Sequence, residues 1–138
     1  MHRFFSDLVA YVKDAKIFGE DLTKDVLVRQ KLAEMALELE VAKLFSYRLA
    51  WLMSKGTVPN YEASMQKVYV TELKHRLAKT ALQILKLYGQ LRGDSKWAQL
   101  RGKAGKFLLE SYYDTIAGGT SEIQRNVIAT RGLGLPRV

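Results

Sequence analysis

Apolar residues recur three and four positions apart along most of this 138-residue chain, and strict alternation of apolar and polar residues is scarce. The first spacing gathers apolar side chains on one face of a helix, whereas alternation is typical of a strand. We therefore expect an all-α protein. Most of the chain is predicted to lie in four main helices, separated by short segments rich in glycine and polar residues.

The two long helices are expected in the middle of the chain. The first begins after Thr23, an N-cap residue type, and ends where Lys55 is followed by Gly56, because a basic residue and a glycine are typical of a helix end. The second begins after Pro59 and extends toward Gly89. The residues expected on the core face of the first long helix are Leu27, Leu32, Met35, Ala36, Leu39, Ala42, Phe45, Leu49 and Met53.

Shorter helices flank this pair. A short amphipathic helix ends before Phe18, and a later helix carries apolar residues from Trp97 to Ile116. Because two long helices joined by a short turn have to lie antiparallel, the expected architecture is an up-and-down four-helix bundle with a short extra C-terminal helix. No linker divides the chain, so residues 1–138 are expected to form a single domain.

The composition is that of a globular protein, with 48% hydrophobic and 26% charged residues. The absence of cysteine excludes a disulfide framework, a thiolate nucleophile and a cysteine-ligated metal. The two histidines are far apart, so we expect no metal site. No stretch approaches the roughly 18 apolar residues of a membrane span, and charge interrupts the N-terminus too early for a signal peptide. The expected location is cytoplasmic.

The formal net charge of +8 at pH 7 favours an anionic partner such as nucleic acid, acidic lipid or a phosphorylated cofactor. One basic cluster consists of Lys79, Lys86, Arg92, Lys96, Arg101, Lys103 and Lys106. No aromatic interleaving and no known DNA-binding motif accompanies it. We interpret the cluster as a solvated or interface surface, and we expect no nucleic-acid partner.

Residues 112–126 combine features of a ligand-binding loop and of a helix start. Gly118–Gly119 allows a backbone to approach a ligand closely, and the helix that follows offers unpaired N–H groups to an anion. The same residues also fit an ordinary turn, in which Thr120 or Ser121 caps the last helix and Ser121 with Gln124 has the spacing of a capping box. The physics of the segment alone favours the second interpretation.

The longer string from Gly118 to Ala129, followed by Leu133–Arg137, closely resembles the C-terminal signature of acyl-CoA dehydrogenases. Three other segments occur in the order in which they occur in that family. Phe18–Gly19 resembles its Arg-x-x-Phe-Gly loop, Leu32–Met35 the start of its next helix, and Ala81–Leu85 the helix end before its Gly-Gly flavin loop. The resemblance extends over essentially the whole chain.

This resemblance implies the C-terminal helical bundle of a larger FAD-dependent enzyme. The reaction it implies is the α,β-desaturation of an acyl-CoA thioester, in which a carboxylate removes the α-proton and the flavin accepts the β-hydrogen as hydride. The family's N-terminal helical domain and middle β-domain do not fit in this chain, and its first helix looks truncated. The resemblance further implies a homo- or hetero-oligomer, either dimer or tetramer, with electron-transfer flavoprotein as the electron acceptor.

The family's catalytic base has no match in this sequence. In one branch the base is a Glu directly before the Gly-Thr of the signature, and that position is Gly118 here, which cannot accept a proton. In another branch the base belongs to the first helix of the bundle, at a place that would precede Met1. We therefore predict no catalytic residue, while Gly119 is expected to contact the substrate. Asp114 and Glu122 flank the loop, and we interpret them as helix-end charges.

Several residues match the family's flavin contacts, which are often made across a subunit interface. The predicted FAD-binding residues are Lys16, Phe18, Gly19, Gln83, Thr120, Ser121 and Glu122. Three features of the family are replaced: the arginine of the Phe-Gly loop by Ala15, a glutamine early in the second helix by Val26, and the Gly-Gly loop by Lys86–Leu87. We expect the chain alone to bind FAD weakly or not at all.

The resemblance supports two hypotheses about function. The first is that the chain is the C-terminal domain of an acyl-CoA dehydrogenase-like flavoprotein, supplying flavin contacts and an oligomer interface but inactive alone. The alternative is a non-catalytic partner subunit of a heteromeric acyl-CoA dehydrogenase, which the missing base at Gly118 fits. We also expect the isolated chain to self-associate, because a bundle without its partner domains leaves apolar surface exposed.

Overall fold

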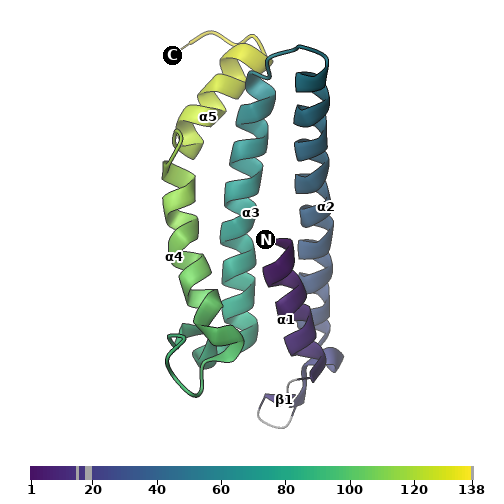
Figure 1. The fold of residues 1–138 in the computed structure, drawn as a ribbon, viewed down its shortest axis with the longest axis vertical. Coiled ribbons are helices and arrows are strands. Elements are labelled where there is room, and N and C mark those ends of the chain that lie inside the picture. Colours follow the sequence, from purple (N-terminus) through teal and green to yellow (C-terminus); the bar gives the residue numbers. More distant parts are fainter. Residues whose placement is uncertain (15, 18–19, 138) are drawn as a thin grey trace.

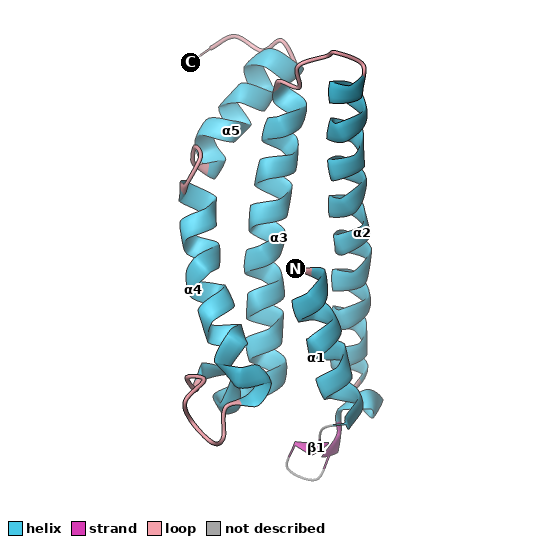
Figure 2. Ribbon diagram, in the orientation of Figure 1, coloured by secondary structure: helices cyan, strands magenta, loops and turns pink. Residues whose placement is uncertain are grey.

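The computed structural model describes residues 1–14, 16–17 and 20–137. Figures 1 and 2 show a bundle of helices with one small hairpin at an end. The helices are α1 (His2–Asp14), α2 (Val26–Ser54), α3 (Tyr61–Leu85), α4 (Lys103–Ile116) and α5 (Ser121–Val127). The remaining elements are β1 (Lys16–Ile17), antiparallel to β2 (Glu20–Asp21), the 3-10 turns η1 (Leu22–Lys24), η2 (Lys86–Gln90) and η3 (Gln99–Gly102), and the π-helical turn η4 (Ile128–Gly132). The predicted all-α bundle with a short C-terminal helix is confirmed.

The long helix α3 lies at the centre of the bundle and packs against α2, α4 and α5. The helices α4 and α5 follow one another along one side of α3, and α2 runs along the other side (Figure 1). The helix α1 has 13 residues, against 29 in α2 and 25 in α3, so it covers only part of their length. Because α4 and α5 share one side of α3, their junction lies beside α3, away from both ends of the bundle (Figure 1).

The core is formed where α1, α2 and α4 meet α3. The large apolar side chains that are fully buried are Leu8, Leu39, Leu73, Leu77 and Leu85. Phe4 of α1 packs against Phe107 of α4 with 4.5 Å between the ring centroids. Because apolar burial is the dominant stabilising contribution to folding, these contacts fix the position of α4 and of the loop that follows it.

The helix α2 begins at Val26 with Asp25 as its N-cap. The carboxylate of Asp25 accepts hydrogen bonds from the backbone N–H groups of Leu27, at 2.8 Å, and Val28, at 3.2 Å. Two of the unpaired donors of the first turn are thereby satisfied. Thr23 lies in η1 instead, so the prediction of a Thr23 cap is wrong.

Two residues of the predicted core face of α2 are exposed. Leu27 and Met53 each expose 66% of their surface. The residues that α2 buries are Val28, Met35, Leu39 and Ala42. Leu27 points about 100° away from Val28 around the helix axis, and Met53 lies in the last turn, so neither reaches the core. The prediction is wrong for these two positions.

The apolar spacing predicts that α4 begins near Trp97, but the helix begins at Lys103. Leu100, Arg101 and Gly102 have positive φ angles of 49°, 54° and 66°. A left-handed turn of this kind cannot continue into a right-handed helix, so the helix starts only after it. Trp97 lies in the preceding loop and is exposed.

Candidate functional site

The two glycines predicted as a ligand-binding loop connect α4 to α5. Gly118 and Gly119 have φ angles of +68° and +93°, which side chains other than glycine rarely adopt. The ammonium group of Lys67 on α3 donates to the carbonyl oxygen of Gly119 at 2.6 Å and to that of Thr115 at 3.3 Å. The amide of Gln124 donates to the carbonyl oxygen of Gly118 at 3.0 Å. The loop is therefore fixed from both sides by side chains.

The two glycines differ in the space around them. A Cβ atom added to Gly118 would meet nothing within 4 Å, whereas one added to Gly119 would lie 2.6 Å from the side-chain nitrogen of Gln124. A side chain at Gly118 would therefore point into open space, whereas one at Gly119 would require the side chain of Gln124 to move.

The start of α5 uses the predicted flavin residues as helix caps. The hydroxyl oxygen of Thr120 accepts a hydrogen bond from the backbone N–H of Ile123 at 3.3 Å. The pKa of Glu122 is lowered, first by its own backbone N–H and then by the hydroxyl of Thr120. Ser121 is buried, and its hydroxyl has no hydrogen-bond partner among the described residues. Thr120 is thus the cap, so the predicted capping box of Ser121 with Gln124 does not form.

The carboxylates closest to this loop are already engaged. Asp114 accepts a hydrogen bond from Lys74 at 2.6 Å, and Glu72 accepts one from Arg125 at 2.7 Å. Glu122 is held at the helix start, and its lowered pKa makes it a poor proton acceptor. Asp114 lies in the last turn of α4 and Glu122 in the first turn of α5, which agrees with the interpretation of both as helix-end charges.

The predicted flavin residues form two separate groups in the structure. Thr120–Glu122 precede Arg125 by about one helical turn at the start of α5, and Arg125 binds Glu72 of α3. Gln83 follows Glu72 by eleven positions (83 − 72) on the same helix, which is roughly 16 Å along the helix axis at about 1.5 Å per residue. A single chain therefore does not bring the two groups together.

Gln83 is in the last turn of α3, and this end of α3 lies at the end of the bundle that carries β1 (Figure 1). Its side-chain oxygen accepts a hydrogen bond from Lys31 of α2. Lys16 lies in β1, at the same end. Three of the residues discussed for the flavin loop lie outside the described part of the chain: Ala15, Phe18 and Gly19.

The residues that replace the family's Gly-Gly loop begin the turn η2. Lys86 has a positive φ of 52°, and Leu87 exposes 76% of its surface. Leu87 lines a surface hollow together with Tyr88, Leu91 and Trp97. Both side chains occupy space that a glycine would leave to an approaching ligand. Val26, which replaces the family's glutamine, is exposed at the first position of α2.

One polar contact near the loop was not predicted. His75 of α3 and Ser111 of α4 form a hydrogen bond of 2.8 Å between Nδ1 and Oγ. The hydroxyl of Ser111 donates its proton to the carbonyl oxygen of Leu108 at 2.6 Å, so the His75 Nδ1–H is the donor to Ser111. The two residues are 36 positions apart, and no sequence signal links them.

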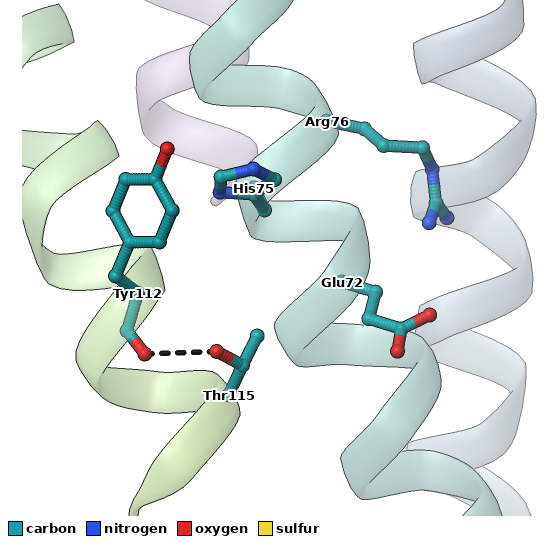
Figure 3. Close-up of a pocket in the computed structure, with 5 residues that line it drawn as sticks. All are labelled: Glu72, His75, Arg76, Tyr112 and Thr115. Carbon is teal, nitrogen blue, oxygen red and sulfur yellow. Dashed lines mark hydrogen bonds between the residues drawn. The ribbon is translucent and has the colours of Figure 1, made fainter. Parts of the chain in front are cut away.

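The hydrogen bond to Ser111 places the proton of the neutral His75 ring on Nδ1. The Nε2 atom is then without a proton, and His75 lines a shallow pocket. Figure 3 shows the pocket, which is lined by Glu72, His75, Arg76, Tyr112 and Thr115. Burial and the nearby Lys79 lower the pKa of His75. The imidazole is therefore neutral at pH 7. The charged residues of this pocket are already paired, Glu72 with Arg125 and Arg76 with Glu38. We therefore interpret the His75–Ser111 hydrogen bond as a structural contact that holds α4 against α3.

The lowered pKa of His75 predicts a stability that depends on pH. Because the pKa of His75 is lower in the folded chain, the unfolded chain binds a proton at His75 more readily. The stabilisation that comes from neutral His75 is therefore complete above pH 6.5 and is lost as the pH falls from there through the folded pKa. We expect the free energy of unfolding to decrease from pH 7 to pH 5, and His75→Asn to flatten this slope. Urea titrations at several pH values measure it, with the exposed His2→Asn as control. Equal slopes in both variants would contradict the prediction.

Two kinds of site are not found in the part of the chain that the structure describes. No group of three or more His, Asp or Glu side chains there is placed to hold a metal ion. None of the described helices is long and apolar enough to cross a membrane.

The profile of the family described as acyl-CoA dehydrogenase, C-terminal domain, matches residues 1–133. The chain belongs to this family, as the glycine-loop signature predicts. A probable acyl-CoA dehydrogenase of Bacillus subtilis is 32% identical over 121 residues, which are 88% of this chain and 30% of that protein. The subunit CarC of the caffeyl-CoA reductase–Etf complex of Acetobacterium woodii is 31% identical over 123 residues, which are 89% of this chain and 30% of that protein.

A solved structure with the same fold is that of the ChsE4–ChsE5 complex from Mycobacterium tuberculosis. It is 30% identical in sequence, with a TM-score of 0.90, and the match covers 99% of this chain and 36% of that chain. The chain thus spans about a third of the length of the proteins it matches.

Members of this family are FAD flavoproteins, and the C-terminal domain contributes to flavin binding. At the α5 end of the chain, Gly118 borders open space and Glu122 is exposed, so the residues there fit contact with a flavin. At the hairpin end, the side chains of Lys86 and Leu87 stand where the family has glycines. The assignment of individual flavin-binding residues stays a prediction.

Proposed function

We propose that this chain acts as the C-terminal domain of a larger FAD-dependent acyl-CoA dehydrogenase-like protein, to which it supplies flavin contacts and an oligomer interface but no catalytic base. The observation that carries the proposal is the α4–α5 loop. It matches the family's signature, it is fixed by Lys67 and Gln124, and it presents Gly118 to open space where one branch of the family has its glutamate.

In the reaction proposed for the assembled protein, a carboxylate removes the α-proton of an acyl-CoA thioester, and bound FAD accepts the hydride from the β-carbon. The described carboxylates around the loop do not serve as this base, because Asp114 and Glu72 are paired and hydrogen bonds in the first turn of α5 hold Glu122 and lower its pKa. The base would therefore come from another part of the protein. Backbone contact between the thioester and Gly119 is the proposed contribution of the loop to substrate binding.

The flavin contacts proposed for this chain come from its two ends. Thr120, Ser121 and Glu122 would serve one flavin from the start of α5, with Ser121 acting through its backbone N–H because its hydroxyl is buried. Lys16, Phe18, Gly19 and Gln83 would serve the flavin of a second subunit. The separation of roughly 16 Å between the groups along α3 supports this division.

The electron acceptor that we propose is an electron-transfer flavoprotein, which the membership of CarC in an Etf complex supports. A heteromeric assembly, in which this chain is a non-catalytic partner subunit, is the second candidate. The missing base at Gly118 and the likeness to the ChsE4–ChsE5 complex favour it. The compartment that we propose is the cytoplasm.

Assays with acyl-CoA test the proposal. The purified chain with excess FAD is expected to desaturate none of a panel of acyl-CoA thioesters, because loss of a general base alone lowers rates by about 10²–10⁴. In the Gly118→Glu variant the side chain would meet open space, although the φ of +68° strains it, and the variant should remain inactive because the flavin site is incomplete. Mass spectrometry detects the enoyl-CoA product. Its formation by the unmodified chain or by the Gly118→Glu variant would refute the proposal.

A further inference from the structure

The turns that connect α3 to α4 carry large apolar side chains around a surface hollow. Leu87 of η2 exposes 76% of its surface, and Trp97, in the loop before η3, exposes 59%. Both line the hollow of about 560 Å³, together with Lys86, Tyr88 and Leu91. Figure 1 shows this segment at the hairpin end of the bundle, where the chain passes from α3 to α4. Large apolar groups gathered on an exposed surface indicate a binding surface.

The same segment is strongly basic. Residues 86–106 contain six basic residues and one acidic residue, Asp94. Two of the six, Lys103 and Lys106, form ion pairs with carboxylates of α1 and α4. The hairpin segment, residues 13–25, has three basic and four acidic residues and adds little to this charge. The other four basic residues of the segment are exposed: Lys86, Arg92, Lys96 and Arg101.

We call these four cations, together with Leu87 and Trp97, the basic tip. Its backbone is held in a closed loop. A Cβ atom at Gly102 would lie 2.5 Å from the backbone nitrogen of Gly93, so the chain entering the loop touches the chain leaving it. Arg92 and Arg101 adjoin these two glycines, and they therefore extend from neighbouring parts of the backbone.

Trp97 is held within this loop beside a cation. Its backbone N–H donates a hydrogen bond to the hydroxyl oxygen of Ser95 at 3.3 Å. The ammonium group of Lys96 lies 5.2 Å from the centre of the Trp97 ring, where the face of the ring attracts a cation. The basic tip therefore presents cations and apolar groups side by side.

This combination indicates the chemistry of the partner. Nucleic acid would neutralise the cations, but its phosphate backbone would not cover an exposed leucine. A neutral apolar partner would leave the cations without counter-charges. An anionic lipid bilayer supplies both contacts, because its headgroups attract Lys and Arg while Trp and Leu enter the boundary between headgroups and acyl chains.

We propose that the basic tip docks this protein on the surface of an anionic lipid bilayer. Leu87 and Trp97 enter the interfacial layer, and the four cations lie against the lipid phosphates. The long basic side chains keep their charges at the level of the headgroups while their carbon chains lie along the apolar groups. This inference goes beyond the proposed function, since it requires neither flavin nor acyl-CoA.

The two tryptophans form a matched pair of probes for this contact. Trp51, near the far end of α2, exposes 58% of its surface, almost the same fraction as Trp97. In Trp51→Phe, which keeps only Trp97, emission should shift to shorter wavelength when vesicles of phosphatidylglycerol and phosphatidylcholine are added. Vesicles of phosphatidylcholine alone should cause no shift. Trp97→Phe, which keeps only Trp51, should show no shift with either kind of vesicle.

Co-sedimentation with the same vesicles measures the affinity. Arg92→Glu combined with Lys96→Glu should weaken binding about a hundredfold or more, because each unit of charge at an anionic surface changes the affinity about fivefold. The matched control is Arg48→Glu combined with Lys55→Glu, which changes the net charge equally but toward the opposite end of α2. This control should bind far more tightly than the first double variant.

The apolar part of the basic tip is tested in the same way. Leu87→Ser should weaken vesicle binding about tenfold, because its side chain no longer enters the interfacial layer. Val58→Ser should leave binding unchanged, since Val58 exposes 86% of its surface but lies in the turn between α2 and α3. Circular dichroism checks that each variant is folded.

Three outcomes would overturn the inference. The first is no binding to anionic vesicles, which would favour an acidic protein as the partner. The second is an equal shift of Trp51 and Trp97, and the third is an equal loss of affinity in the two double variants. None of these outcomes bears on the proposed function, because the vesicle assays contain neither flavin nor acyl-CoA.

Discussion

Replacing Leu77 by alanine should lower the free energy of unfolding by about 3–4 kcal/mol, which is a large part of the stability of a domain of this size. Leu77 is fully buried in the second half of α3, within the core that α1, α2 and α4 share. Its truncation removes apolar contacts and leaves a cavity between rigid helices, which relax only in part.

Chemical unfolding at one fixed protein concentration measures this effect, since association also contributes to apparent stability. Leu109→Ala on the outer side of α4 is the matched control, because Leu109 exposes 72% of its surface. The control should lose about 0.5 kcal/mol or less. If the two variants lost the same stability, the position of α3 at the centre of the core would be wrong.

Replacing Lys67 by methionine should loosen the α4–α5 loop and lower the free energy of unfolding by about 1–3 kcal/mol. The ammonium group of Lys67 binds the carbonyl oxygens of Thr115 and Gly119, which are at the end of α4 and in the loop. Methionine keeps most of the apolar part of the side chain but leaves both oxygens without their charged donor. Cations at a helix C-terminus are also favoured by the helix dipole.

Hydrogen exchange followed by mass spectrometry measures the loosening directly. Peptides that span residues 115–124 should exchange about tenfold faster in Lys67→Met than in the unmodified chain, since 1.4 kcal/mol corresponds to a factor of ten. Lys106→Met serves as control, because Lys106 is exposed and forms only a 3.8 Å pair with Glu110. Unchanged exchange in the loop would show that Lys67 does not position it.

The sequence predicted the helical bundle because its apolar spacing and its helix ends agree over long stretches. The helix α2 ends at Ser54, beside the predicted Lys55, and the glycine pair separates α4 from α5 as expected. Boundaries failed where the decisive factor was not local. The left-handed turn at Leu100 and Arg101 has no signature in residue type, so the apolar spacing alone extends α4 back to Trp97.

The sequence located the candidate loop but not its surroundings. The motif at Gly118 identified the loop and the family, whereas Lys67, which fixes the loop, lies about fifty positions earlier and carries no motif. The hydrogen bond of His75 with Ser111 depends on the packing of α3 against α4. Contacts between residues so far apart follow from the tertiary structure and cannot be derived from spacing along the chain.

The central claim is that this chain holds only part of a flavin site, and the amount of FAD that it retains tests this claim most directly. The chain is mixed with excess FAD and passed through a gel-filtration column, and the flavin absorbance of the protein peak is compared with its protein content. Circular dichroism confirms that the protein in the peak is helical. We predict far less than one FAD per chain. A yellow protein with one FAD per chain, bleached by an acyl-CoA, would contradict the account.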